Sequence, residues 1–319
     1  MKRKISFLLV VLLMANLILV GCASKSGVQN PDVKEEKFTV GITTFSVAND
    51  YIRVGKSAAE EQAKKVGVEL IASVDDDVAK RTSSIENFTT KGVDAIIVHE
   101  GDISQVKPAL MEAKKKGILI VAMNSGYDDI ADLVVEPDNI SLGEVAAEEM
   151  AKLIGNKGNI IEIYNDAGAM IKARKDAMHK VIEKYPDMKV TNGFVYAWPD
   201  YFPDAKSKME AILQANPNPG EVSAVFATFY GVGLAATQAI REKGLQDSIV
   251  VVGIDSDPET FIEMKKSDSP YKATVMSDPD YLGRTAIDNL FALLKGEKID
   301  KKHILIPSEL ITKDNIPLQ

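Results

Sequence analysis

An α/β protein of two lobes is the fold class that the sequence predicts, and three observations support it. From Lys37 onward, short runs rich in β-branched residues alternate with longer amphipathic segments, which is the pattern of a parallel sheet with crossover helices. The short runs are apolar throughout, as parallel strands buried on both faces are. About 300 residues exceed the usual size of a single core, and the alternation restarts after Gly155.

Each expected strand is a short β-branched run, and each expected helix is a longer amphipathic segment. Up to Gly155, the strands are "KFTVGITTF", "GVELIASV", "GVDAIIVHE", "GILIVAMN" and "DLVVEP", and the helices span 50–66, 78–91, 104–116 and about 139–154. After Gly155, the strands are "GNIIEIYN", "MKVTNGFVYA", "VSAVFATF" and "SIVVVGID", and the helices lie near 168–185, near 204–215, at 231–243 and from Pro258.

The N-terminal segment has the charge order of a secretory signal. Lys2, Arg3 and Lys4 precede an almost unbroken apolar run that ends just before Cys22, the single cysteine of the chain. The end of this run, "LVGC", resembles the bacterial lipobox, in which the cysteine is linked to diacylglycerol and becomes the first residue after cleavage. The resemblance implies a signal peptide at 1–21 and a lipid-anchored tether at 22–36. The alternative is an uncleaved transmembrane anchor, for which the run falls short of ~20 residues.

Charge and composition argue against several functions. The formal net charge is −8, and an acidic chain without a basic patch argues against nucleic acid and anionic membrane surfaces as partners. His99, His179 and His303 are too scattered for a metal site, and His179 is expected to be exposed. The acidic run at 75–77 lacks the other ligands of a calcium loop, so a solvated turn is favoured there. Without a catalytic triad or phosphate loop, the sequence predicts no enzyme, metal or cofactor.

The candidate binding site follows from the expected sheets. In open α/β sheets, ligands bind beyond the carboxyl ends of the strands, so the residues that follow each strand are the candidates. They are Phe45 to Tyr51, His99 and Glu100, Asn124 and Ser125, 165–169, Trp198, Phe229 and Tyr230, 255–257, and Ser277 and Asp278. Whether His99 or Glu100 reaches the site stays open at this stage.

Three side chains are suited to holding a sugar-like ligand. The carboxylate of Asp255 can accept hydrogen bonds from two neighbouring hydroxyls, although a helix N-cap is the alternative role, which Ser256 or Asp257 fills equally well. Trp198, the only tryptophan, offers a flat face for stacking, and packing within a lobe is its alternative. Arg174 sits early in a helix, where the dipole disfavours it, so a ligand or a carboxylate partner is expected rather than solvent.

The segment "FYGVGLAATQAI" contains a glycine pattern that also occurs in dinucleotide-binding proteins. Gly231, Gly233 and Ala236 follow a strand and open a helix, and Asp255 ends the next strand. This unit lies deep in the chain, however, and a secreted protein finds no nicotinamide pool. Glycines that let the helix pack closely on the sheet are therefore the favoured interpretation.

Residues 37–315 resemble the type I periplasmic binding proteins of the ribose and simple-sugar group, the receptors of ABC importers. The resemblance rests on segments along the whole domain, among them "EPDNISLGEVAAEEMAKLI", "NPGEVSAVFATFYGVGLAATQAI" and "IVVVGIDSDPE". It implies a monomer of two Rossmann-like lobes, 37–138 with 278–305 and 139–277 with 306–319, joined by a three-segment hinge.

The same resemblance implies the ligand positions, which correspond to Asn49 and Tyr51 with Phe45 nearby, to Arg174, to Trp198 and to Asp255. The chain departs from ribose-type proteins at three places: Asn124-Ser125 replace Asp-Arg, Phe229-Tyr230 replace Asn-Asp, and Ser277 replaces glutamine. With fewer charged groups, the site is expected to prefer a less hydroxylated or a larger, more stackable ligand than ribose.

These observations predict an extracytoplasmic, lipid-anchored receptor that captures a small sugar-like ligand between two lobes and delivers it to an ABC permease. A hexose, a deoxy sugar, a disaccharide, a nucleoside-like ligand or an autoinducer-type ligand all remain open. The alternative is a receptor that presents its closed form to a membrane sensor kinase or chemoreceptor. Both partners would respond to closure of the lobes, so the sequence does not separate the two functions.

Overall fold

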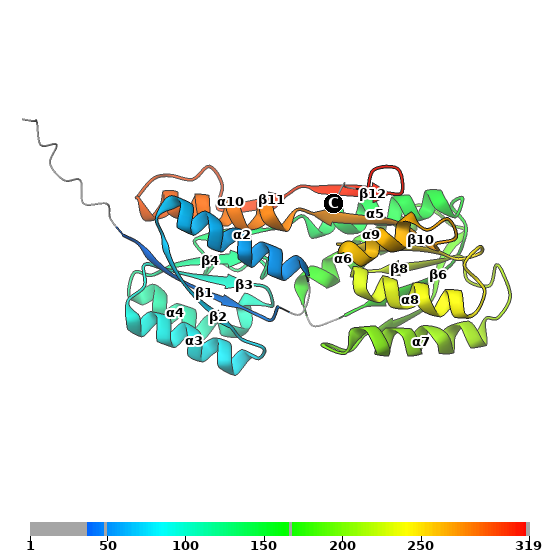
Figure 1. Ribbon diagram of the computed structural model, residues 1–319, viewed down its shortest axis with the longest axis horizontal. Helices are drawn as coiled ribbons and strands as arrows, with labels where there is room; N and C mark the ends of the chain where they lie inside the picture. The colour runs from blue at the N-terminus through cyan, green and yellow to red at the C-terminus, as the bar shows by residue number, and fades with distance from the viewer. Residues whose placement is uncertain (1–36, 48–49, 166–167, 317–319) are drawn as a thin grey trace, which may run out of the picture. The chain divides into compact units, whose positions relative to one another are not determined.

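The computed structural model describes residues 37–47, 50–165 and 168–316, which form two α/β lobes, each with a six-stranded sheet (Figure 1). The predicted fold class is therefore confirmed. The predicted signal peptide, Cys22, the tether and Asn49 lie outside the described residues. In the described part of the chain, no helix is both long and apolar enough to cross a membrane.

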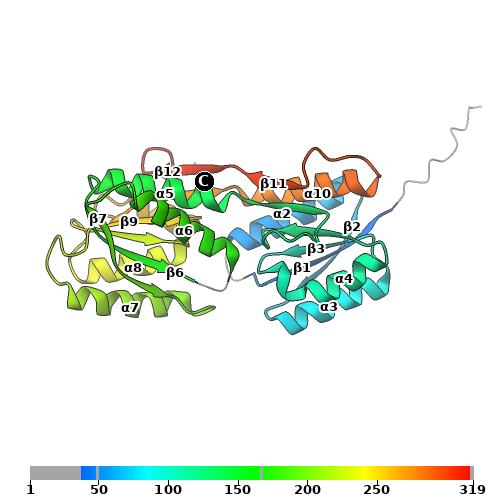
Figure 2. The ribbon, with the colours of Figure 1, turned by 180° about the vertical axis from the view of Figure 1, so that it is seen from behind.

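The first sheet is entirely parallel, with the strand order β11-β5-β4-β3-β1-β2. Helices α2 and α10 cover one face, and α3, α4 and the 3₁₀ turn η1 cover the other (Figure 2). The bounds are β1 (Thr39–Thr44), α2 (Asp50–Val66), β2 (Glu69–Val74), α3 (Val78–Lys91), β3 (Ala95–His99), η1 (Ile103–Val106), α4 (Lys107–Lys115), β4 (Leu119–Met123), β5 (Leu133–Pro137), α10 (Pro279–Leu294) and β11 (His303–Ile306).

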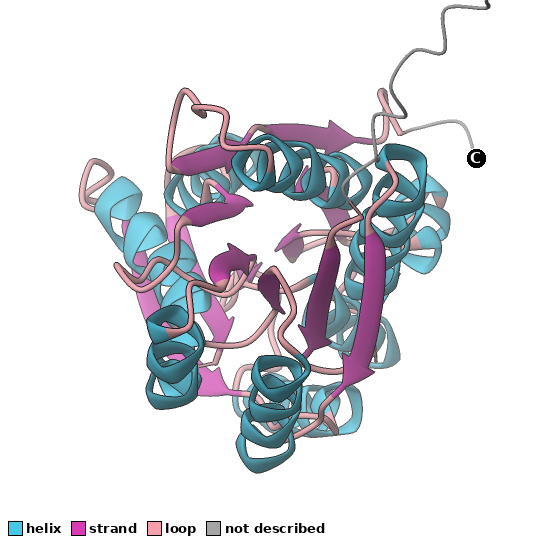
Figure 3. Cartoon of the chain, turned by 90° about the vertical axis from the view of Figure 1, so that its left-hand side faces the viewer, coloured by secondary structure: helices cyan, strands magenta, loops and turns pink. Residues whose placement is uncertain are grey.

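The second sheet has the order β12-β10-β9-β8-β6-β7, and only the pair of β10 and β12 is antiparallel. Helices α5 and α6 cover one face of this sheet, and α7, α8 and α9 cover the other. Figure 3 shows the chain from the side of the first lobe, with helices lying around the strands. The bounds are α5 (Asn139–Leu153), β6 (Gly158–Tyr164), α6 (Ala169–Ile182), β7 (Met188–Val195), α7 (Tyr201–Ala215), β8 (Ala224–Ala227), α8 (Tyr230–Glu242), β9 (Val250–Ile254), α9 (Pro258–Lys265), β10 (Tyr271–Ser277) and β12 (Ser308–Thr312).

Most expected elements match the structure within a few residues, and the differences have local causes. The expected helix at 104–116 is divided into η1 and α4, because Pro108 in the first turn of α4 suits the start of a new helix. Helix α7 begins three residues earlier than expected, at Tyr201, because a proline such as Pro203 is tolerated in a first turn. Strands β11 and β12, with 4 and 5 residues, were not among the expected elements, and the bounds of β10 and α10 were not predicted either.

The chain passes between the two sheets at three points. Asp138 follows β5 of the first sheet and caps α5 of the second lobe, accepting a hydrogen bond from the Ser141 amide at 3.0 Å. Asp278 follows β10 of the second sheet and caps α10 of the first lobe in the same way. Pro307 stands between β11, whose last residue is Ile306, and β12.

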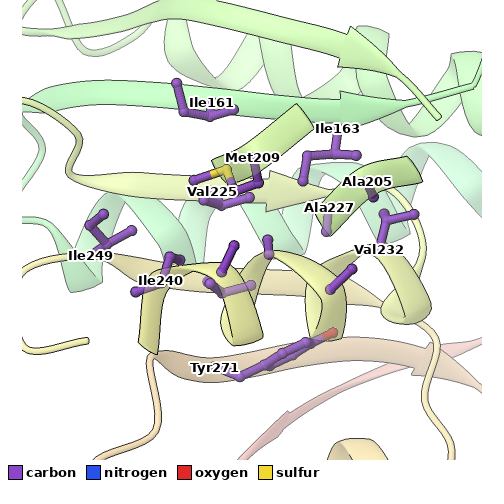
Figure 4. Packing of buried hydrophobic residues seen from close by; sticks show 14 of the residues in the cluster. Ile161, Ile163, Ala205, Met209, Val225, Ala227, Val232, Ile240, Ile249 and Tyr271 are labelled. Carbon is purple, nitrogen blue, oxygen red and sulfur yellow. The ribbon is translucent and has the colours of Figure 1, made fainter. Parts of the chain in front are cut away.

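In the core of the second lobe, two glycines make room for a buried tyrosine. Tyr271 is buried between β9 and α8 and belongs to the cluster of apolar side chains shown in Figure 4. A Cβ atom at Gly253 would lie 1.8 Å from the Tyr271 hydroxyl, and one at Gly233 would lie 2.8 Å from the Tyr271 ring. The tyrosine therefore occupies the space that these glycines leave free.

Candidate binding site

A cavity of about 160 Å³ lies at the carboxyl ends of the strands and is lined by residues of both lobes. The first lobe contributes Phe45, Tyr51, Ile52, Glu100, Gly101 and Asn124, and the second contributes Met170, Ile171, Arg174, Tyr196, Trp198, Phe229, Tyr230 and Asp255. Sites for drug-sized ligands usually measure about 300–1,000 Å³. The cavity therefore suits a small solute.

In the second lobe, a buried arginine holds a buried aspartate. From its Nη1 atom, Arg174 donates to Asp255 Oδ2 at 2.7 Å and to the Thr228 carbonyl oxygen at 3.0 Å. Its Nε atom donates to Asn139 Oδ1 at 2.9 Å. The expected carboxylate partner of Arg174 is thus Asp255, and the alternative of a solvated arginine is wrong. Among the described residues Nη2 has no acceptor, which leaves two N–H groups for a ligand.

Asp255 keeps one carboxylate oxygen without a protein partner. Its side chain is buried, and Oδ1 accepts no hydrogen bond from any described residue. Burial raises the pKa of this carboxyl group, although the charge and the hydrogen bond of Arg174 act in the opposite direction. The N-cap alternative is wrong for this residue, because Asp257 caps α9 through the Thr260 amide at 2.7 Å. A buried acceptor without a donor is costly unless a ligand supplies one.

In the first lobe, Glu100 and Asn124 form a second polar pair. Asn124 Nδ2 donates to Glu100 Oε1 at 2.7 Å, and both residues are buried. Because a carboxylate only accepts, this bond fixes the orientation of the amide, and Asn124 Oδ1 is left without a donor among the described residues. Glu100 therefore reaches the cavity. His99 is fully buried and does not line it.

The three acidic and amide residues of the site share a backbone conformation. Glu100, Asn124 and Asp255 have φ angles of 63°, 50° and 61°, in the left-handed region, and each directly follows a strand. This conformation costs a non-glycine residue roughly 1–3 kcal/mol and is found disproportionately at ligand-binding sites. Asn and Asp adopt it more readily than most other residues.

Aromatic rings form the other wall of the cavity. Trp198 stacks on Tyr201 with ring centroids 5.5 Å apart, and both rings lie in T-shaped arrangements with Phe229, at centroid distances of 6.3 and 5.0 Å. Tyr230 packs against Phe229 at 4.4 Å. Trp198 keeps 37% of its surface exposed, so its ring is available to a solute. Such a wall favours stacking on the C–H face of a ring over hydrogen bonding.

A hydrogen bond near the cavity connects the two lobes. The Tyr51 hydroxyl in α2 lies 2.9 Å from Ser277 Oγ at the end of β10. Burial raises the pKa of Tyr51 well above its usual value, so the hydroxyl stays protonated. Ser277 thus contacts Tyr51 and does not line the cavity. Ser125 does not line it either, since its hydroxyl donates to the Val98 carbonyl at 3.0 Å.

Arg81, a buried residue of α3, binds the backbone behind the first-lobe wall of the cavity. Its guanidinium donates to the carbonyl oxygens of Glu100 at 2.6 Å and Thr43 at 3.1 Å, and it lies 5.6 Å from the centre of the Phe45 ring. Burial lowers the pKa of Arg81 to about 10, so the side chain remains charged at neutral pH. It holds the ends of β1 and β3 in the conformation that brings Glu100 to the cavity.

The structure also brings residues into the cavity that the sequence did not indicate. They are Ile52, Gly101, Met170, Ile171 and Tyr196. Tyr196 directly follows β7, which ends at Val195, and was missed because the strand was expected to continue to residue 197. Ile52, Met170 and Ile171 lie near the starts of α2 and α6, at positions that the search of strand ends did not include.

The other sequence motifs have structural roles. A Cβ atom at Gly231 would lie 2.5 Å from the Tyr201 ring, which supports close packing of α8. Asp75 is buried and Asp77 caps α3, so the expected solvated turn is wrong at Asp75. His179 is partly exposed and lies 2.7 Å from Glu162. Among the described residues, no cluster of three possible metal-binding side chains occurs.

Comparison with known proteins agrees with this geometry. A family model described as a periplasmic binding protein domain matches residues 40–298, and the chain belongs to this family. It is 28% identical over 303 residues to a xylitol-binding protein of Mycolicibacterium smegmatis, covering 93% of this chain and 82% of that protein. It is 27% identical over 328 residues to a ribose import binding protein of Bacillus subtilis, covering 98% and 100%.

Among solved structures, the fold is similar to an ABC transporter solute-binding protein from Agrobacterium vitis with bound allitol. The TM-score is 0.82 at 25% identity, and the match covers 87% of this chain and 96% of that chain. The resemblance predicted from the sequence is therefore confirmed.

Proposed function

We propose that this protein captures a small hydroxylated solute, a sugar or a polyol, in the cavity between its lobes and delivers it to an ABC permease outside the cytoplasm. The observation that carries the proposal is the chemistry of the cavity. Buried acceptor atoms of Asn124 and Asp255 have no donor among the described residues, and both side chains line the same cavity as the aromatic wall. The similar proteins named above bind xylitol, ribose and allitol, which are all hydroxylated.

The apolar lining limits the number of hydroxyl groups that the solute can present. Ile52, Met170, Ile171 and Phe229 offer no hydrogen bond, and a ligand hydroxyl facing them would lose its water without replacement. We therefore expect a solute with hydroxyl groups on one side and an apolar face on the other. This supports the expectation that ribose is a poor ligand.

Capture is proposed to occur by closure of the lobes about the passages at Asp138, Asp278 and Pro307. Closure excludes water, which strengthens the hydrogen bonds to the buried polar groups. The closed form of a monomer would then be recognised by the permease. The described residues bind and orient a solute, and the protein is proposed to act as a receptor rather than as an enzyme.

Trp198→Ala is expected to weaken solute binding at least tenfold, about 1.4 kcal/mol, because the aromatic wall loses its exposed ring. Calorimetric titration of a binding sugar or polyol measures the change. Tyr281→Ala is a matched control, since Tyr281 is exposed on α10 and does not line the cavity. Equal affinity of the Trp198 variant and the wild type would show that the tryptophan does not contact the solute.

The proposal also includes anchoring of the protein to the membrane by a lipidated Cys22. Cys22→Ala is expected to block lipid attachment and cleavage after Gly21, since the lipidated atom is the cysteine sulfur. Mass spectrometry of the mature protein and fractionation of cells measure both effects. An unchanged mature mass and membrane association in this variant would exclude the lipid anchor.

A further inference from the structure

The described side chains at the cavity and packed beneath it carry more negative than positive charges. Arg174 is paired with Asp255 at 2.7 Å. On the first-lobe side, Arg81 interacts electrostatically with both Glu100 and Asp75, so two carboxylates share one guanidinium. Among the described residues at and directly below the cavity, there is thus one more carboxylate than guanidinium. A buried charge without a partner is costly, and a ligand can provide the partner.

The excess charge belongs to Glu100, which lines the cavity, and not to Asp75. Asp75 accepts hydrogen bonds from Thr43 Oγ1 at 2.6 Å, Ser73 Oγ at 2.8 Å and Ser84 Oγ at 2.9 Å, so both of its oxygens are occupied. Glu100 has a hydrogen bond to Oε1 only, from Asn124, and no described residue donates to Oε2. Its carboxylate is therefore the one that can accept from a solute.

His99 is the other group that could compensate Glu100. Its Nε2 atom lies 3.5 Å from Glu100 Oε1, and its ring is fully buried with Nδ1 3.4 Å from Thr44 Oγ1. A distance of 3.5 Å is long for a charge-assisted hydrogen bond. His99 therefore interacts only weakly with the Glu100 carboxylate.

The free hydrogen-bond acceptors of the cavity also favour a ligand with a positively charged donor group. In the described part of the chain, no group donates to the buried oxygens Asp255 Oδ1 and Asn124 Oδ1, and none donates to Glu100 Oε2. A hydroxyl group offers one donor and remains an acceptor itself. An ammonium group offers three donors, accepts nothing and carries the missing positive charge.

We infer that the solute carries a protonated amino group beside its hydroxyl groups, and that Glu100 makes the protein prefer this amino group to a hydroxyl group. This inference rests on the proposed function. Amino sugars and amino polyols are the chemical class that fits. Arg174 Nη2 remains available for a hydroxyl oxygen of the same solute, and the aromatic wall for its C–H face.

Matched pairs of compounds test this inference in the purified protein. Calorimetric titration compares glucosamine with glucose, galactosamine with galactose, and an aminocyclitol with the corresponding inositol. We expect the amine of at least one pair to bind at least tenfold more tightly than its hydroxyl parent. Glu100→Gln keeps an acceptor for Asn124 but removes the charge, so it should abolish this preference. Glu112→Gln, an exposed residue on α4, is the charge-matched control and should retain it.

The possible outcomes separate this inference from the proposed function. Neutral sugars or polyols that bind as tightly as their amines, or a preference that survives Glu100→Gln, would overturn the role of Glu100 while the proposed function stands. If neither amines nor neutral compounds bind, both are wrong. Preferential binding of the amine that Glu100→Gln abolishes and Glu112→Gln retains supports the inference.

Discussion

Asparagine in place of Asp255 is expected to weaken solute binding at least tenfold, about 1.4 kcal/mol, with the fold retained. The amide oxygen must face the Arg174 guanidinium, as Oδ2 does now at 2.7 Å. The amide NH₂ group then takes the place of Oδ1, so the free acceptor in the cavity becomes a donor. A solute hydrogen that pointed at Oδ1 loses its partner. Calorimetric titration of the same solute into both proteins measures the effect.

Two further variants show whether the effect belongs to this side chain. Asp257→Asn lies two residues away and caps α9, a role that asparagine fills as well as aspartate, so affinity and stability should not change. Asp255→Ala also leaves Arg174 buried without its partner, and the free energy of unfolding should fall by about 3–5 kcal/mol. A wild-type affinity in the Asp255→Asn protein would remove Asp255 from the site.

Gly143→Ala is expected to lower the free energy of unfolding by about 1–3 kcal/mol and to weaken solute binding as well. Gly143 lies in α5, where a Cβ atom would be 2.3 Å from the Arg174 carbonyl oxygen and 2.9 Å from Ala177 Cβ. Because the first of these atoms is backbone, α6 must move away from α5. Arg174 moves with it, so the pair with Asp255 is disturbed. Denaturant unfolding and titration measure the two effects.

Gly55→Ala is the matched control for this prediction. Gly55 is also a buried glycine within a helix, but a Cβ atom there would lie no closer than 3.5 Å to His99 and to the Pro279 carbonyl. Alanine favours a helix interior over glycine by about 1 kcal/mol, so this variant should be as stable as the wild type or more stable. Equal stability changes in both variants would mean that helix propensity, and not the contact with α6, decides the result.

Local sequence patterns predicted most of the fold. The buried parallel strands are continuous β-branched runs, and helices such as α2 and α3 have the expected bounds. The division between η1 and α4 depends on a single proline, Pro108. The strand order within each sheet depends on tertiary packing, which a single sequence does not reveal directly.

The polar half of the cavity could be predicted because the ends of parallel strands meet at one edge of a sheet. Asn124, Arg174 and Asp255 were found in this way or by resemblance, and the structure brings them to one cavity. The position of Arg174 early in a helix indicated a ligand or a carboxylate partner, but local sequence does not identify Asp255 as that partner, because the two residues lie 81 positions apart in the chain. The support from Arg81 to Glu100 was missed for the same reason.

The most direct test is a thermal-shift screen of the purified protein against pentoses, hexoses, deoxy sugars, disaccharides, polyols, amino sugars, nucleosides and autoinducer-type furanoses. A ligand at ~100 times its dissociation constant adds about 2.7 kcal/mol to stability, which is easily detected. We expect one hydroxylated class to stabilise the wild type and to have much less effect on the Asp255→Asn and Trp198→Ala proteins. Stabilisation of all three proteins to the same extent, or of none by any compound, would contradict capture of a hydroxylated solute in this cavity.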